Sequence, residues 1–231
     1  MDRSDSRVQL VERFFAGTGR SYDFMVNAAT FGIDRLWKRR IVACVPPDAR
    51  RILDLACGTG ISTLALALAR PQARVTGVEL RDEYLAVARE KAARRGFENV
   101  DFALSRAEDY TAPEPVDCIV ASYLPKYADL EVLVPRMRAQ LQPGGSIVMH
   151  DFTYPPGVWR QRLWALYFKG LQTVGSRLFP SWREIYFGLP ELIKETTWTE
   201  DLTDRLREAG FREVRLEYLT LYGSALVTAR V

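Results

Sequence analysis

The segment Asp-Leu-Ala-Cys-Gly-Thr-Gly, residues 54–60, limits the possible folds of this chain more than any other feature. An apolar run at residues 51–55 leads into it and predicts a short strand, and a helix is expected from Ile61 onward. Gly58 and Gly60 permit a tight turn in which the backbone approaches a ligand closely, which side chains would prevent. The start of the following helix offers unpaired N–H groups to a carboxylate. The segment therefore predicts a strand–turn–helix unit that binds a small ligand.

An acidic residue follows at the spacing that a nucleoside ligand requires. Glu79 ends the expected second strand, 19 residues after Gly60 (79 − 60), where a doubly wound sheet places the acid that accepts both ribose hydroxyls. A nicotinamide dinucleotide site has the same geometry but needs a third glycine where this chain has Thr63. The carboxylate of Asp54 would repel a pyrophosphate, whereas it can hold the amino-acid end of S-adenosylmethionine. The pattern favours S-adenosylmethionine, with S-adenosylhomocysteine as product, over a dinucleotide or a turn that binds nothing.

Residues 48–151 form the expected cofactor-binding core. Short strands alternate there with helices, which predicts a parallel sheet with helices on both faces, a Rossmann-like doubly wound α/β fold. The expected strands are residues 51–55, 75–78, 100–104, 118–121 and 146–149.

The ends of two helices in this core can be predicted from single residues. Asp82 is expected to N-cap one helix, and Gly96 to close it in a left-handed turn. A second helix is expected at about residues 129–141, ended by Gln-Pro-Gly-Gly at residues 142–145.

We interpret residues 1–231 as one domain, in which the rest of the chain surrounds this core. Residues 1–47 predict a helical N-terminal cover, and residues 152–198 a helical lid insertion rich in aromatic and basic side chains. Residues 199–231 predict a helix and two antiparallel strands that close the sheet edge. Apolar residues at helical spacing in the N-terminal cover are Val8, Val11 and Phe15.

Composition narrows the partners and the compartment. The formal charge is +3, from 32 basic and 29 acidic residues, which is too balanced to favour nucleic acid. The three cysteines form no CxxC pair, the first residues lack an apolar signal core, and no run approaches the roughly 18 apolar residues of a membrane span. We expect a cytoplasmic protein without a metal site. The aromatic and basic insertion suits either contact with the inner face of a membrane or a closed lid over the binding site. A homodimer is also consistent with the sequence.

The motifs resemble those of known methyltransferases. Residues 54–60 are similar to motif I of class I S-adenosylmethionine-dependent methyltransferases, and Leu-Gln-Pro-Gly-Gly at residues 141–145 is similar to the turn before their fifth strand. A closer resemblance is to the ubiquinone/menaquinone biosynthesis C-methyltransferases. Residues 22–25 and 31–39 follow that family's N-terminal signature, and the resemblance extends from about residue 8 to the C-terminus. It implies methylation of a polyprenyl quinone precursor, a small hydrophobic acceptor.

The motif positions and the resemblance together define the expected cofactor site. The family's contacts carry over onto Thr59, Glu79, the pair Arg106-Ala107 and Ser122, but Arg106 replaces a small polar residue that helps to recognise adenine. Glu108 is a candidate for that role, and Tyr22 is expected to lie over the methyl donor. The full set of expected cofactor-binding residues is Tyr22, Asp54, Ala56, Gly58, Thr59, Gly60, Glu79, Leu80, Ala107, Glu108 and Ser122.

The expected acceptor site departs from the family pattern. The family carries an Arg-Asn pair on the loop after the fourth strand, which residues 122–129 lack, and an Asp where this chain has Ile61. His150 and Asp151, expected at the carboxyl end of the fifth strand, are the candidate catalytic residues, with a purely structural role as the alternative. The candidate substrate-binding residues, which could instead only shape the loop, are Tyr123, Lys126 and Tyr127.

Three functions are consistent with these residues. The leading hypothesis is C-methylation of a polyprenyl quinone precursor. The enzymatic alternative is an N- or O-methyltransferase of another small molecule or lipid headgroup. The third is a non-catalytic cofactor-binding subunit of a biosynthetic complex, which would bind S-adenosylmethionine without turning over an acceptor.

Overall fold

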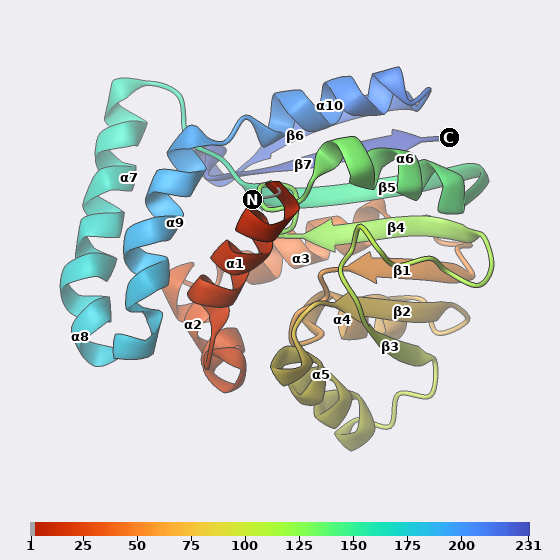
Figure 1. Cartoon of the computed structure of the whole chain (residues 1–231), viewed down its shortest axis with the longest axis horizontal. Coiled ribbons are helices and arrows are strands. Elements are labelled where there is room, and N and C mark those ends of the chain that lie inside the picture. The colour runs from red at the N-terminus through yellow and green to blue at the C-terminus, as the bar shows by residue number, and fades with distance from the viewer. Residues whose placement is uncertain (1–2) are drawn as a thin grey trace.

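A computed structural model describes residues 3–231 and contains one seven-stranded sheet in the order β3-β2-β1-β4-β5-β7-β6 (Figure 1). The strands pair in parallel from β3 to β5, and β7 pairs antiparallel with both β5 and β6. This confirms the mostly parallel, doubly wound sheet with an antiparallel C-terminal pair. The strands are β1 (Arg51–Leu55), β2 (Arg74–Glu79), β3 (Val100–Leu104), β4 (Val116–Ser122), β5 (Leu141–Phe152), β6 (Arg212–Leu219) and β7 (Ser224–Arg230).

Helices bury both faces of the sheet. On one face, α6 (Leu130–Gln140) and α10 (Trp198–Glu208) place Leu133 and Leu202 in a core with no exposed side-chain surface. On the other face, α3 (Ile33–Cys44) and α4 (Ile61–Ala69) contribute Ile41 and Leu66, also fully buried. Each such side chain stabilises the fold by about 1.5–3 kcal/mol. α5 (Asp82–Arg94) packs against β2 and β3.

The N-terminal cover and the insertion lie together beyond the carboxyl ends of β1 and β4 (Figure 1). The cover contains α1 (Arg3–Phe15) and α2 (Tyr22–Ala29) ahead of α3, and the insertion contains α7 (Val158–Gly170), α8 (Ser176–Leu178) and α9 (Arg183–Glu195). Their apolar faces form a core of their own around Phe14, Met25, Trp182 and Ile185. Gly188 permits the close approach of α1 and α9, because a Cβ there would lie 2.5 Å from Cζ of Phe14.

Several boundaries differ from the sequence expectation. The N-cap of α5 is Arg81 and not Asp82, which is the first residue of the helix, and no side chain makes a capping hydrogen bond at this N-cap. Gly96 adopts the expected positive φ, at 67°. Residues 142–145 belong to the beginning of β5 and follow a helix that ends at Gln140. β5 also continues to Phe152, because β7 pairs with it along residues 146–152. Within residues 3–231, no helix is long and apolar enough to cross a membrane.

Candidate active site

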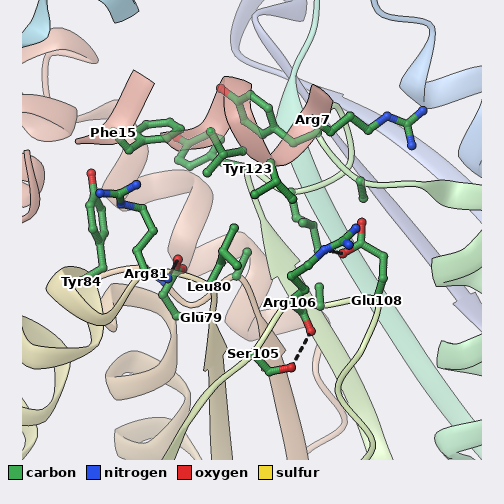
Figure 2. Close-up of a pocket in the computed structure, with 18 of the residues that line it drawn as sticks. Arg7, Phe15, Glu79, Leu80, Arg81, Tyr84, Ser105, Arg106, Glu108 and Tyr123 are labelled. Carbon is green, nitrogen blue, oxygen red and sulfur yellow. Dashed lines mark hydrogen bonds and ion pairs between the residues drawn. The ribbon is translucent and has the colours of Figure 1, made fainter. Parts of the chain in front are cut away.

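A cavity lies at the carboxyl ends of β1, β2 and β4 and encloses about 830 Å³ of space, including the part open to solvent. Figure 2 shows Phe15 and Tyr123 on the side of the N-terminal cover and Glu79 and Leu80 on the opposite side. The cavity is lined by Arg7, Val8, Val11, Phe15, Tyr22, Ala56, Gly58, Glu79, Leu80, Arg81, Tyr84, Ser105, Arg106, Ala107, Glu108, Ser122, Tyr123, Leu124, Tyr127 and Ala128.

The turn after β1 orients Glu79 into this cavity. Ala56, Gly58 and Gly60 have φ of 55°, 58° and 80°, the left-handed conformation that glycine tolerates and that makes the turn tight. The N–H of Gly58 donates to Oε2 of Glu79 over 2.9 Å, and the N–H of Arg81 donates to Oε1 over 3.0 Å. Each oxygen keeps a lone pair for a further donor, so the carboxylate can accept two ribose hydroxyls. Burial raises the pKa of Glu79, which these two backbone bonds partly offset.

Asp54 provides a second carboxylate beneath the turn. Its side chain is 1% exposed, and Oδ2 accepts a hydrogen bond from the hydroxyl of Thr63 over 2.6 Å. Oδ1 is buried without a partner among the described residues. Burial raises the pKa of Asp54 to about 6. A buried carboxylate oxygen without a donor is costly, and the ammonium group of a bound amino acid would satisfy it. The residues present therefore fit S-adenosylmethionine.

Most of the expected cofactor-binding residues lie around one cavity. Those in its wall are Tyr22, Ala56, Gly58, Glu79, Leu80, Ala107, Glu108 and Ser122. Glu108 is held by the N–H of Asp129, which donates to its Oε1 over 3.0 Å, and its role toward adenine stays a prediction.

Asp54, Thr59 and Gly60 lie outside the cavity wall, and their contacts with the cofactor stay predictions. The hydroxyl of Thr59 donates to Oδ1 of Asp23 over 2.5 Å, and the ammonium of Lys91 donates to Oδ2 of Asp23 over 2.6 Å. Thr59 therefore fastens α2 to the cofactor turn.

Sequence reasoning missed part of the wall: Arg7, Arg81, Tyr84 and Ser105. Tyr84 lies five residues after Glu79 (84 − 79), in the first turn of α5, and this short spacing from the expected ribose-binding acid could have identified it as a wall residue. The hydroxyl of Ser105 donates to the carbonyl oxygen of Arg106 over 3.0 Å, a local bond that no spacing indicates (Figure 2).

A second, larger cavity, with about 1420 Å³ of space including the part open to solvent, adjoins the first. Helices α2, α7 and α9 and the turn after β6 surround it, and its wall is mostly aromatic and aliphatic, with Met25, Trp164, Phe168 and Leu189 among its residues. Cavities of this kind suit hydrophobic small molecules. Its charged wall residues are Lys126 and Arg160.

Four aromatic side chains belong to the walls of both cavities: Phe15, Tyr22, Tyr123 and Tyr127. The ring of Tyr22 packs edge-on against that of Tyr84, with centroids 5.2 Å apart. A group bound in the apolar cavity would therefore meet a group bound in the first cavity at this aromatic boundary. All three expected substrate-binding residues, Tyr123, Lys126 and Tyr127, line the apolar cavity, and their contact with a substrate stays a prediction.

The two candidate catalytic residues line neither cavity. His150 and Asp151 lie at the carboxyl end of β5, as expected, because the strand ends at Phe152, but both side chains are 0% exposed. Nδ1 of His150 is 3.0 Å from the hydroxyl oxygen of Ser122. Burial, with the nearby ammonium groups of Lys38 and Lys126, lowers the pKa of His150 well below its usual range, so the ring is neutral. The catalytic role of His150 and Asp151 stays a prediction.

Comparison with known proteins identifies the family. The profile described as "ubiE/COQ5 methyltransferase family" matches residues 1–229. The chain belongs to this family. It is an S-adenosylmethionine-dependent methyltransferase. When bound, S-adenosylmethionine supplies an electrophilic methyl group.

Curated relatives agree with this assignment, and solved structures share the fold. The methyltransferase is 29% identical over 214 residues to the demethylmenaquinone methyltransferase of Staphylococcus aureus (strain JH9), covering 91% of this chain and 88% of that protein. The solved structure of the S-adenosylmethionine-dependent methyltransferase SibL shares the fold, with a TM-score of 0.61 and 21% identity over 87% of this chain. This chain covers 56% of SibL. An S-adenosylmethionine-dependent methyltransferase from Aquifex aeolicus also shares it, with a TM-score of 0.56 and 18% identity over 84% of this chain and 89% of that one.

Proposed function

We propose that this methyltransferase C-methylates a quinone precursor that carries a polyprenyl tail. The observation that carries the proposal is the shared aromatic boundary between the two cavities. A methyl donor bound in the first cavity would lie on one side of Tyr22 and Tyr123, and the apolar cavity would hold a ring and a long hydrocarbon tail on the other side. The relatives in Staphylococcus aureus are named demethylmenaquinone methyltransferases, which agrees with an acceptor of this chemical class.

The polar groups of the apolar cavity support a ring with an oxygen substituent. The ammonium of Lys126 lies 4.4 Å from the ring centroid of Tyr127 and 5.5 Å from that of Tyr123, at the aromatic boundary. This ammonium group is ion-paired with Asp151, and its remaining N–H donors could stabilise a substrate oxygen on which negative charge develops. Methyl transfer from a sulfonium needs its partners held in line and water excluded, and both cavities lie under helical cover.

The mouth of the apolar cavity is proposed to receive its substrate from an anionic membrane surface. Four of its wall residues are large, apolar and exposed: Phe31 (81%), Leu221 (64%), Trp159 (53%) and Leu163 (52%). The guanidinium of Arg160 lies 4.7 Å from the ring of Trp159, and α7 also presents Arg162 and Lys169 to solvent. Apolar side chains beside basic groups suit the headgroup region of a bilayer that contains anionic lipids.

The turn Thr220–Tyr222 at this mouth is held in an unusual conformation. Its three residues have φ of 30°, 55° and 66°, which non-glycine residues rarely adopt and which costs of order 1–3 kcal/mol for each. Two contacts hold the turn: Trp37 donates from its indole nitrogen to the hydroxyl of Thr220 over 2.9 Å, and the guanidinium of Arg160 lies 5.0 Å from the ring of Tyr222. This conformation exposes Leu221, which supports a role in contact with lipid.

The experiment that tests the proposed function is transfer of a ¹³C-methyl group from S-adenosylmethionine to a prenylated demethylquinol, with the product position read by NMR. Gly58→Arg serves as the inactive control, because its side chain would occupy the cofactor turn. A methyl group on a ring carbon supports the proposal. A methyl group on oxygen, or on the nitrogen of an amine acceptor offered in parallel, would show an O- or N-methyltransferase instead. Tight cofactor binding with no transfer to any acceptor would indicate a non-catalytic subunit.

A further inference from the structure

Asp34 is a buried carboxylate directly behind the boundary between the two cavities. It lies in the first turn of α3 and is 4% exposed. The hydroxyl of Tyr123 donates to its Oδ1 over 2.5 Å, and the ammonium of Lys38 lies 3.8 Å from the same oxygen. The Asp34 carboxylate is therefore close to the apolar cavity, and Tyr123 lies between the two.

Tyr123 is the residue that joins Asp34 to both cavities. It lines each of them, and it has a φ of 66°, a left-handed conformation that is rare for a tyrosine and recurs at functional sites. Two contacts hold it there: its N–H donates to the carbonyl oxygen of His150 over 2.8 Å, and its ring stacks on that of Phe152 at 4.7 Å and 15°. Lys38 lies 4.5 Å from the ring centroid on the side of Asp34.

We propose that Asp34 accepts the proton that the methyl acceptor must lose, and that the hydroxyl of Tyr123 relays it. The inference rests on the proposed function, because it requires an acceptor with a phenolic hydroxyl in the apolar cavity. Tyr123 is then the catalytic residue that touches the substrate, and Asp34 is a positioning residue that acts through it.

The proton and electron movements balance with these two groups. The phenolic proton of the acceptor moves to Oη of Tyr123 while the proton of Tyr123 moves to the carboxylate of Asp34. The ring carbon beside the phenolate oxygen forms the bond to the methyl group with an electron pair from the ring, and sulfur keeps the pair of the broken S–C bond. The methylated carbon then loses its hydrogen as a proton and the ring oxygen takes up a proton, so that one proton is released for each methyl group transferred.

The electrostatic surroundings agree with a relay. Burial, followed by the nearby carboxylate of Asp34, raises the pKa of Tyr123 well above its usual range, so its hydroxyl stays protonated and passes a proton on rather than storing a negative charge. Apart from each other, the ionisable groups that face Asp34 and Tyr123 are Tyr22 on α2, Lys38 on α3, Lys126 after β4, and His150 and Asp151 on β5.

The test compares kcat/KM for the prenylated demethylquinol between pH 7 and 9 in the wild type, Asp34→Asn and Tyr123→Phe. We expect each substitution to lower kcat/KM about 10²–10⁴-fold at pH 7 with little change in the Kd for S-adenosylmethionine. In the variants the acceptor must ionise without help, so log kcat/KM should rise by about one unit for each pH unit. The difference in kcat/KM between each variant and the wild type should therefore become smaller toward pH 9. Asp34→Glu, which keeps the carboxylate, should recover part of the lost activity.

Each other outcome overturns the inference. A loss that is the same at every pH would indicate a structural role for Asp34, and a loss of less than about threefold would exclude a part in proton transfer. If Asp34→Asn fails to fold, Tyr123→Phe alone decides, since it keeps the ring that stacks on Phe152. A wild type that methylates no phenolic acceptor refutes the proposed function, and the inference with it. An active wild type with fully active variants refutes the inference alone.

Discussion

The ammonium group of Lys126 forms an ion pair with the carboxylate of Asp151, and the two side chains are 1% and 0% exposed. Asp151 also accepts hydrogen bonds from the N–H groups of Lys126 and Phe152, over 3.2 and 2.8 Å. Lys126, on the loop after β4, is thus fixed to the carboxyl end of β5 beside the apolar cavity. Burial raises the pKa of Asp151 and lowers that of Lys126, and their mutual attraction opposes both shifts.

Removing one member of this pair should strongly destabilise the protein. Lys126→Met leaves the Asp151 carboxylate buried without its counter-charge, and we expect the free energy of unfolding to fall by about 3–5 kcal/mol in urea denaturation. Lys126→Met combined with Asp151→Leu should recover most of that loss.

The matched control is Lys194→Met, which removes an exposed ion pair with Glu191 (39% and 62% exposed) and should cost less than about 1 kcal/mol. Equal effects of Lys126→Met and Lys194→Met would mean that the Lys126–Asp151 pair is open to water.

The affinity for S-adenosylmethionine should depend on the protonation of Asp54. Because burial raises the pKa of this carboxyl to about 6, it is neutral below that pH and cannot pair with the ammonium group of the cofactor. We expect the Kd, measured by isothermal titration calorimetry, to fall as pH rises from 5 through 6 and to level off above 7. Asp54→Asn should bind more weakly at pH 7 and lack this dependence. A wild-type Kd that is constant from pH 5 to 7 would show that Asp54 does not hold the cofactor.

The same carboxyl should influence the stability of the cofactor-free protein in the opposite direction. Its pKa is about 6 in the folded state against 3.8 as the unperturbed value, so between these pH values the folded protein binds more protons than the unfolded chain. Its contribution to stability is therefore present at low pH and is lost as pH rises through 6, by up to about 3 kcal/mol. In urea unfolding, the free energy of unfolding of Asp54→Asn minus that of the wild type should increase by about that amount from pH 4 to pH 7. A constant difference between the two proteins would contradict the raised pKa.

The mouth of the apolar cavity should bind anionic vesicles. Trp159→Glu and Leu221→Glu each remove exposed apolar surface and add a charge of the wrong sign, and we expect each to weaken co-sedimentation with phosphatidylglycerol vesicles about tenfold. The control is Leu68→Glu, on α4 and 74% exposed, which should bind like the wild type. Equal loss in all three variants would mean that only net charge matters, and no binding by the wild type would exclude this membrane contact.

Much of the fold could be predicted because its signals are local. The glycines of residues 54–60, the acid at Glu79 and the alternation of strand and helix are all expressed within short windows of sequence. Most of the expected cofactor-binding residues line one cavity for the same reason, since the carboxyl ends of parallel strands meet at one edge of a sheet.

The acceptor side could not be predicted in this way because its contacts join distant segments. Asp34 and Tyr123 are 89 residues apart, and the left-handed conformation of Tyr123 has no signature in a tyrosine side chain. His150, the one histidine of the sequence, is a catalytic candidate by residue type, but the rings of Trp37 and Tyr123 pack against its imidazole and its side chain is 0% exposed. Contacts between segments far apart in the chain decide such burial, and residue spacing does not reveal them.

The most direct test of the account measures KM for demethylquinols with and without a prenyl tail, in the wild type and in Leu189→Trp. Leu189 lines the apolar cavity from α9, and Phe187→Trp, on the same helix, exposed (44%) and outside the cavity wall, is the matched control. If the cavity holds the tail, KM for the tailed acceptor is at least about tenfold lower than KM for the tailless acceptor, both in the wild type and in Phe187→Trp. Leu189→Trp should abolish that advantage while activity on the tailless acceptor persists. A KM that does not depend on the tail, or that Leu189→Trp leaves unchanged, would contradict the assignment of this cavity to the methyl acceptor.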